Sequence, residues 1–172
     1  STTLFQNDHG IYVWAVTNYT VHHNLFYDNG RGYHIQNYAA SQVTNGFYVY
    51  NNTFDQPTMA GSAPTACVIL TYTNTDVQFK NNIFNNCPSG YAFTWFAPGV
   101  QTNVVMSFNV SDSADADMNN PGSKPSSGIT TSNNTVGSGS INFTNAAAGD
   151  YSLLSTSVAL NSGTTVGYAA NG

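Results

Sequence analysis

The stretch Val21-His22-His23-Asn24-Leu25-Phe26 decides the fold, because the chain repeats its pattern along much of its length. Two clear copies are Val49-Tyr50-Asn51-Asn52-Thr53-Phe54 and Phe79-Lys80-Asn81-Asn82-Ile83-Phe84, and a fainter one is Met106-Ser107-Phe108-Asn109-Val110. Each copy has an apolar residue followed three positions later by an Asn, and the first three add a Phe two positions after that Asn. The Asn residues recur at intervals of roughly 27 to 30 positions, a period typical of repeat architectures.

A second pattern precedes each Asn motif: a short run rich in aromatic and β-branched residues, opened by a small residue. Such residues favour β-strands, and in a strand successive side chains point to opposite faces. The expected inward set is Ile11, Val13, Tyr33, Ile35, Cys67, Ile69, Tyr91 and Phe93. The expected outward set is Tyr12, Trp14, His34, Gln36, Val68, Leu70, Ala92 and Thr94.

These two patterns predict an all-β parallel solenoid of about four or five coils, with almost no helix. An Asn at the same turn of every coil can bond to its neighbours along the stack, so Asn24, Asn52, Asn82 and Asn109 are expected to form a ladder. Phe26, Phe54 and Phe84 are then expected to stack beside it. The predicted coils cover residues 1–111, an irregular surface excursion covers 112–140, and a loop-rich closing segment of the same domain covers 141–172.

The composition excludes some classes of partner. The chain has 172 residues, a net charge of -5 and only 6% charged residues, against about 25% in typical globular domains. Its only basic residues are Arg31, Lys80 and Lys124. Because nucleic-acid sites need clustered cations, we expect no nucleic-acid binding, and no apolar run approaches the roughly 20 residues that a membrane-spanning helix needs.

The cysteines and sequons leave two questions open. Cys67 and Cys87 fit either one disulfide in an oxidising compartment or two buried free thiols. Five N-glycosylation sequons begin at Asn18, Asn51, Asn109, Asn133 and Asn142. A chain rich in Asn, Ser and Thr forms such triplets by chance, so their use as glycosylation sites stays open. The chain opens without the basic and apolar run of a secretory signal, which suggests a mature or excised chain.

A family resemblance rests on these motifs. The pattern His9-Gly10-Ile11-Tyr12-Val13, then Asn24-Leu25-Phe26, then Gly32-Tyr33-His34-Ile35, with recurring Asn-Asn-x-Phe, resembles the right-handed parallel β-helix proteins of the pectate-lyase-like superfamily over residues 7–111. The stretch 149–163 is similar to the closing element of secreted bacterial members, with Val158 where that element has Pro. The resemblance implies a right-handed β-helix, a truncated or small secreted member, and an extracellular or cell-surface location.

The candidate active site is a strip on the outward face of the strands. Its expected catalytic residues are His34, Tyr12 and Arg31, and its expected substrate-binding residues are Trp14, Gln36, His9 and Trp95. Aromatic faces beside hydrogen-bonding groups suit sugar rings, and Arg31 could hold a uronate carboxylate through two parallel bonds. The β-elimination of the resembling lyases also needs a base and an acid, roles that His34 and Tyr12 could fill. Ordinary exposed residues of a β-face are the alternative.

Three other constellations are weaker. His22 and His23 point to opposite faces of a regular strand, so they cannot both grip one metal there. The stretch 112–117 offers Asp oxygens for Ca²⁺, the one cofactor considered, but it lacks the Gly and Glu of an EF-hand loop, and a solvated acidic loop is the alternative. Asn74-Thr75-Asp76 is similar to an element of polygalacturonase-like hydrolases whose other elements are absent, so a lyase is favoured over a glycoside hydrolase.

The function predicted from the sequence therefore has two forms. The first is an extracellular carbohydrate-active protein, a lyase of uronate-containing polysaccharide. The second is a non-catalytic module that binds polysaccharide, acts in adhesion, or self-associates through exposed solenoid ends. The first form is the leading prediction and rests on the family resemblance. The scarcity of ionisable groups counts for the second form, because catalysis on a polysaccharide generally needs several of them.

Overall fold

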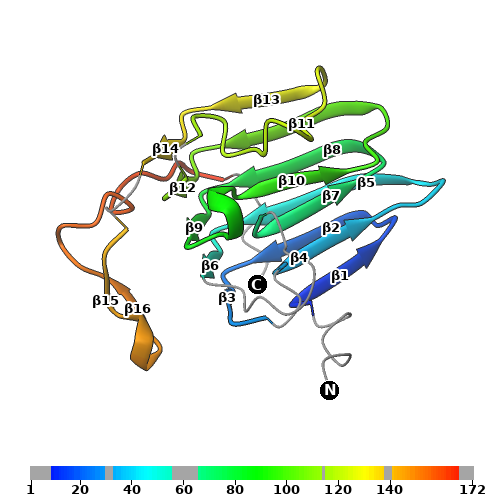
Figure 1. Cartoon of the computed structure of the whole chain (residues 1–172). Helices are drawn as coiled ribbons and strands as arrows, with labels where there is room; N and C mark the ends of the chain where they lie inside the picture. Colours follow the sequence, from blue (N-terminus) through cyan, green and yellow to red (C-terminus); the bar gives the residue numbers. More distant parts are fainter. Residues whose placement is uncertain (1–8, 30–32, 56–65, 114, 138–140, 167–172) are drawn as a thin grey trace.

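The chain is a parallel β-solenoid of about 4 turns. A computed structural model describes residues 9–29, 33–55, 66–113, 115–137 and 141–166. Each coil contributes one strand to each of three parallel sheets, which run side by side along the solenoid (Figure 1). The predicted all-β solenoid is confirmed.

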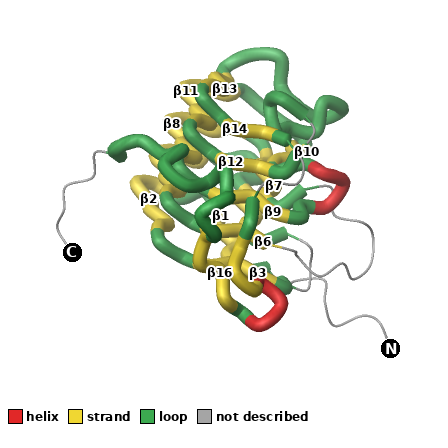
Figure 2. Tube along the Cα trace, turned by 90° about the vertical axis from the view of Figure 1, so that its left-hand side faces the viewer, coloured by secondary structure: helices red, strands yellow, loops and turns green. Residues whose placement is uncertain are grey.

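Sheet A holds the first strand of each coil, in the order β1 (Ile11–Trp14), β4 (Ile35–Tyr38), β7 (Val68–Thr71) and β10 (Phe93–Phe96). Sheet B holds the second strands, β2 (Thr17–His22), β5 (Val43–Tyr50), β8 (Thr73–Lys80), β11 (Gln101–Ser107) and β13 (Ile129–Ser132). Sheet C holds the third, β3 (Leu25–Tyr27), β6 (Thr53–Asp55), β9 (Ile83–Asn85), β12 (Val110–Ser111) and β14 (Thr135–Val136). Viewed from the side, the strands lie one above another in columns (Figure 2).

A further partial coil lies inside the stretch 112–140, which the sequence suggested was an irregular excursion. β13 pairs with β11, β14 pairs with β12, and Asn119 forms a bridge to Phe93 at the end of sheet A. The strands are short and rich in Thr and Ser, and a turn-forming stretch separates them from coil 4. Their polar character hid them from a search for aromatic and aliphatic runs.

The predicted Asn ladder is present and one rung longer than expected. The backbone N–H and Nδ2 of Asn24 donate to Oδ1 of Asn52 at 3.0 and 3.1 Å, and Asn52 donates in the same way to Asn82 at 3.0 and 3.0 Å. The pattern continues from Asn82 to Asn109 and from Asn109 to Asn134. Nδ2 of each interior rung also donates to a backbone carbonyl of the preceding coil. Buried amides are thus satisfied along the whole stack.

The residue before each rung explains the Asn-Asn pairs of the sequence. His23, Asn51, Asn81, Phe108 and Asn133 have φ values of 55°, 53°, 56°, 55° and 53°. This left-handed region is costly for most residues but is tolerated by Asn. The first Asn of each pair therefore makes the sharp corner between sheets B and C, and the second makes the ladder.

The core beside the ladder is a stack of phenylalanine rings. The Phe26 and Phe54 centroids lie 4.9 Å apart with an interplanar angle of 6°, and those of Phe54 and Phe84 lie 4.8 Å apart at 5°. Phe93 then packs edge-on against Phe84. The expected Phe stack is confirmed, and its rings fill the interior without polar atoms.

A second polar ladder, which the sequence did not predict, lies at the corner between sheets A and B. Nδ2 of Asn37 donates to Oδ1 of Asn74 at 2.7 Å, and Nδ2 of Asn74 donates to Oε1 of Gln101 at 2.9 Å. The Thr44 hydroxyl donates to Oδ1 of Asn37 at 2.8 Å. Asn37, Thr44 and Asn74 are fully buried, so this network satisfies polar groups inside the solenoid.

The expected facing of β7 is wrong by one residue. Val68 and Leu70 are level with the inward residues Ile35 and Asn37, and Ile69 is level with Gln36. Val68 and Leu70 are fully buried, contrary to the outward prediction. Because every residue from Cys67 to Leu70 is apolar, no polar and apolar alternation fixes the phase of this strand.

Two additions tie the later chain to the coils. Cys67, just before β7, forms a disulfide with Cys87, just before the short helix η1 (Pro88–Gly90), so the free-thiol alternative is excluded. The hairpin of β15 (Phe143–Asn145) and β16 (Asp150–Leu153), joined by η2 (Ala146–Ala148), contacts the body through Tyr151. The Tyr151 hydroxyl donates to Oδ2 of buried Asp55 at 2.9 Å, and burial together with this bond raises the pKa of Tyr151 to about 12.

Candidate functional site

An exposed aromatic strip runs across the outer face of sheet A at its coil-1 end. Tyr12 and Trp14 alternate outward from β1 and are 47% and 53% exposed. Trp14 is level with Tyr38 on β4, and Tyr12 is level with Gln36. Tyr72 follows β7 at the adjoining corner. We call this set, His9, Tyr12, Trp14, Gln36, Tyr38 and Tyr72, the aromatic strip.

The rings of the strip are in mutual contact. Tyr12 stacks on His9 at 5.7 Å and on Tyr38 at 6.2 Å between ring centroids, and Trp14 lies 4.9 Å from Tyr38. Tyr72 packs edge-on against Tyr38 at 5.4 Å, with the two hydroxyls 3.4 Å apart. The contacts hold several ring faces and hydroxyls in fixed positions on one surface, an arrangement suited to apolar sugar faces and their hydroxyls.

The strands that carry the strip contain no formally charged residue. Strands β1, β4, β7 and β10 contain no Asp, Lys or Arg. Burial and the neighbouring Tyr38 raise the pKa of Tyr12, and the hydrogen bond to Tyr38 raises the pKa of Tyr72. Both phenols are therefore protonated at neutral pH and act as hydrogen-bonding groups, so Tyr12 is a poor proton acceptor there.

His34 does not lie on this surface, and its expected catalytic role is corrected. Its side chain is fully buried, with its ring 6.2 Å from that of Phe26 and 5.8 Å from that of Phe54. Nδ1 lies 2.6 Å from Nδ2 of Asn29. Position 34 precedes β4, so the alternation of the strand does not extend to it. An imidazole inside the core cannot reach a polysaccharide on the outer face.

The other predicted site residues divide between the surface and the core. Tyr12, Trp14, Gln36 and His9 come together in the strip. Trp95 is 4% exposed, and its Nε1 donates to Oδ1 of Asn119 at 2.9 Å, so it is an interior residue and not a sugar contact. Arg31 lies outside the described residues. Tyr38 was missed, although extending the alternation of β4 by two residues beyond Gln36 would have found it.

Burial of His34 predicts a pH-dependent stability. Desolvation lowers the pKa of His34 to about 4, and a contact with the backbone of Asp55 opposes this shift. Because the unfolded chain binds its proton near pH 6.5, stability falls as the pH drops from about 6.5 toward 4, by about 2 kcal/mol between pH 7.5 and pH 5. Urea unfolding at these two pH values, compared with His34→Gln, measures this loss; an equal loss in the variant would contradict it.

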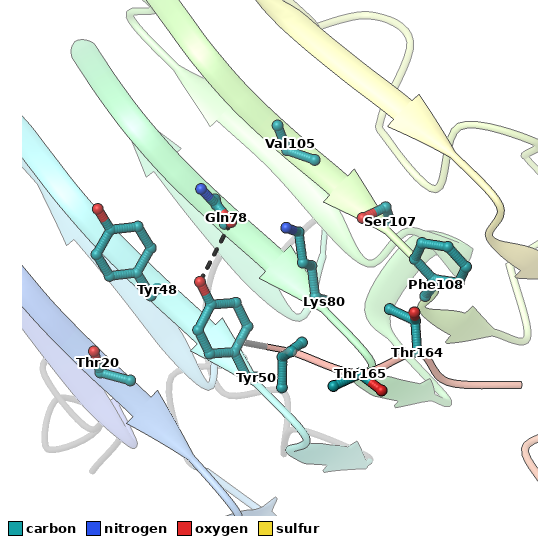
Figure 3. Close-up of a pocket in the computed structure, with 11 residues that line it drawn as sticks. Thr20, Tyr48, Tyr50, Gln78, Lys80, Val105, Ser107, Phe108, Thr164 and Thr165 are labelled. Atoms are coloured by element: carbon teal, nitrogen blue, oxygen red, sulfur yellow. Dashed lines mark hydrogen bonds between the residues drawn. The ribbon is translucent and has the colours of Figure 1, made fainter. Parts of the chain in front are cut away.

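A polar groove of about 630 Å³ lies on the outer face of sheet B (Figure 3). Tyr48 and Tyr50 project from β5, Gln78 and Lys80 from β8, and Ser107 from β11, while residues 164–166 of the C-terminal part border it. Next to two of the lining residues, Asp76 on β8 accepts hydrogen bonds from the Tyr48 hydroxyl and Nε2 of Gln78, and also from Nδ2 of Asn103. Within the described part of the chain, the side chains that bond to Asp76 are two amides and a phenol, whereas inverting hydrolysis needs a second carboxylate.

The acidic loop that was considered for Ca²⁺ directs its carboxylates to different protein partners. Oδ2 of Asp112 accepts a hydrogen bond from the backbone N–H of Asn86, and Oδ1 of Asp115 accepts one from the backbone N–H of Asp117. The Asp117 carboxylate forms an ion pair with Lys124. Among the described residues, no group of three or more His, Cys or Asp side chains converges on a point where a metal ion could be held. The His22 and His23 rings are perpendicular, with Nδ1 atoms 2.8 Å apart.

Within the described ranges, no helical segment has the length and apolar character needed to cross a bilayer.

Comparisons of the chain with protein-family models, with curated proteins and with solved structures gave no match. The architecture and the side-chain geometry therefore carry the functional argument.

Proposed function

We propose that this protein is a non-catalytic polysaccharide-binding module and that the aromatic strip of sheet A is its binding surface. The observation that carries the proposal is the set of contacting rings of Tyr12, Trp14 and Tyr38 on one parallel sheet, with Tyr12 and Trp14 exposed and Tyr38 half-buried. Strands in the sheet are about 4.8 Å apart, a spacing close to the width of a sugar ring. The rings offer apolar faces, and the phenols and Gln36 offer hydrogen bonds to hydroxyls.

The lack of charged residues on the strands of the strip favours a neutral ligand. A neutral hexose polymer presents apolar ring faces and hydroxyl groups, both of which the strip can contact without burying an unpaired charge. A uronate lyase needs a cation on the carboxylate, a base and an acid. Of the residues expected to fill these roles, the candidate base His34 is buried, Tyr12 is protonated at neutral pH and so suits an acid but not a base, and Arg31 lies outside the described residues. The geometry therefore favours binding over β-elimination.

The relationship to the pectate-lyase-like superfamily belongs to the same proposal. Its support is the parallel solenoid with an Asn ladder at one corner and a Phe stack beside it. A right-handed coil and an extracellular or cell-surface location follow from that relationship. The disulfide between Cys67 and Cys87 agrees with such a location, because disulfides persist in oxidising compartments.

Trp14→Ala is expected to weaken binding to a soluble neutral β-glucan by about tenfold, or about 1.4 kcal/mol. The substitution removes an exposed ring that contacts Tyr38 and would contact the ligand. Isothermal titration calorimetry or affinity electrophoresis against a panel of neutral glucans measures the effect. Tyr27→Ala is the matched control, because Tyr27 is 56% exposed but lies on sheet C.

The proposal fails if no neutral polysaccharide binds, or if Tyr27→Ala weakens binding as much as Trp14→Ala. A parallel absorbance scan at 235 nm over uronate polymers, with and without Ca²⁺, tests the lyase reading. Release of unsaturated product would replace the binding proposal by a catalytic one.

A further inference from the structure

The groove on sheet B differs from the aromatic strip in one respect that determines its ligand: it contains a cation. Lys80 lies on the groove floor, level with Tyr50 on β5 and with Ser107 on β11. It is one of only three basic residues in the chain. Among the described residues, Lys124 is paired with Asp117, whereas the Lys80 ammonium has no carboxylate within ion-pair distance. Its charge is available to an anion from solution.

The groups around Lys80 are held in place by a hydrogen-bond network. The Tyr50 hydroxyl donates to Oε1 of Gln78 at 3.3 Å, and Nε2 of Gln78 donates to Oδ1 of Asp76 at 3.1 Å (Figure 3). Tyr50 also stacks on Tyr48 at 6.1 Å between centroids. This network fixes the tyrosine rings beside Lys80 before any ligand arrives, which lowers the entropy cost of binding.

The negative charge in the groove does not cancel that of Lys80. Asp76 already accepts three hydrogen bonds, from Tyr48, Gln78 and Asn103. Its Cα lies about 13 Å from that of Lys80 at the rise of an extended strand, four residues away along β8. Among the described residues, Asp76 forms no ion pair with Lys80. The Asp76 carboxylate is therefore held by protein partners other than Lys80.

One wall of the groove is the segment Thr164–Val166, which Asn81 attaches to the end of β8. Nδ2 of Asn81 donates to the Thr164 carbonyl at 2.6 Å, and the Thr164 N–H donates to Oδ1 of Asn81 at 2.9 Å. Figure 3 shows Thr165 near Tyr50 and Lys80, and Thr164 next to Phe108. The wall gives the cation a bounded site instead of an open sheet face.

We propose that this groove is a second saccharide site, which binds a carboxylate-bearing sugar unit through an ion pair with Lys80. The Tyr50 ring offers an apolar face to the sugar, and the Ser107 hydroxyl, on the other side of Lys80, hydrogen-bonds to it. The groove lies on a different sheet from the aromatic strip, so this proposal does not depend on the proposed function of the strip.

The test is calorimetric titration of the full chain with a uronic acid trisaccharide and with its methyl ester, at low salt. Wild-type protein is expected to bind the acid at least tenfold more tightly than the ester. Lys80→Met keeps the aliphatic stem and should weaken acid binding at least tenfold, while Lys80→Arg should retain most of it. Lys124→Met makes the same change in net charge away from the groove and should leave the affinity unchanged.

Asn81→Gly tests the wall separately. Asn81 has φ of 56°, so Gly keeps the corner while removing both bonds to Thr164, and a several-fold loss of acid binding is expected. Equal affinity of Lys80→Met and Lys124→Met, no preference of the wild-type protein for acid over ester, or loss of acid binding in Trp14→Ala but not in Lys80→Met would each overturn the proposal. Binding of neutral glucan to the same variants tests the strip, so the two failures are distinguishable.

Discussion

Asn82→Ala is expected to lower the free energy of unfolding by about 3–5 kcal/mol. Oδ1 of Asn82 accepts from both the N–H and the Nδ2 of Asn52, and its Nδ2 donates to Oδ1 of Asn109 and to the Val49 carbonyl. Asn52, Asn82 and Asn109 are almost entirely buried, so water cannot replace the lost partners. Each buried group left unsatisfied costs about 1–3 kcal/mol, and at least two are left. Urea unfolding monitored by circular dichroism gives the change in midpoint.

Asn24→Ala is the matched control for that experiment. Asn24 is exposed at the coil-1 end of the ladder, where its Nδ2 donates to Oδ1 of Asn52 and to the His22 carbonyl. Its removal exposes the freed groups to water, so a loss below about 1 kcal/mol is expected. Equal losses in the two variants would show that the ladder bonds do not depend on burial and would contradict the account of the core given above.

Removing the disulfide is expected to cost about 3 kcal/mol. Cys67 and Cys87 are 20 positions apart in the chain, and closing a loop of that length restricts the unfolded chain by about 3 kcal/mol in the chain-entropy model. The double variant Cys67→Ala, Cys87→Ala avoids a free thiol and leaves small apolar groups at two buried positions. Thermal and urea unfolding of the variant, beside the oxidised and the reduced wild-type protein, measure the loss.

Reduced wild-type protein should match the double variant to within about 1 kcal/mol. If reduction leaves the unfolding midpoint unchanged while the oxidised state is verified by mass spectrometry, the disulfide is not a source of stability. The two stability experiments address separate parts of the solenoid, since the ladder lies between sheets B and C and the disulfide lies beside sheet A. Their effects should add.

The features that the sequence predicts best are those in which the same residue type recurs at the same corner of every coil. Asn24, Asn52 and Asn82 recur with a steady period, and both the ladder and the Phe stack follow from that period. The second ladder could not be found in this way, because Asn37, Asn74 and Gln101 differ in type and are unevenly spaced. A side chain at this corner needs only to reach its neighbour and to offer it a hydrogen-bond donor or acceptor. Asn and Gln both meet this requirement, so the residue type can change from coil to coil.

The candidate site was predicted only where alternation along a strand applies. Tyr12, Trp14 and Gln36 lie within strands, and all three face outward as expected. His34 lies one residue before its strand and turns into the core beside Phe26 and Phe54. Trp95 fails for another reason: Phe93 was expected to point inward, so alternation along β10 places Trp95 inward too, level with Leu70, and including it in the outward strip went against that alternation.

The Asn ladder has a direction, and that direction gives the solenoid an electrical axis. From Asn24 to Asn109 the backbone N–H and one Nδ2–H of each rung point toward the following coil, and from Asn52 to Asn134 each Oδ1 points toward the preceding one. Aligned amides of this kind add their dipoles, as peptide groups do along a helix. The coil-1 end of the row is therefore partially negative and the opposite end partially positive, so a cation is favoured at the first end and an anion at the second.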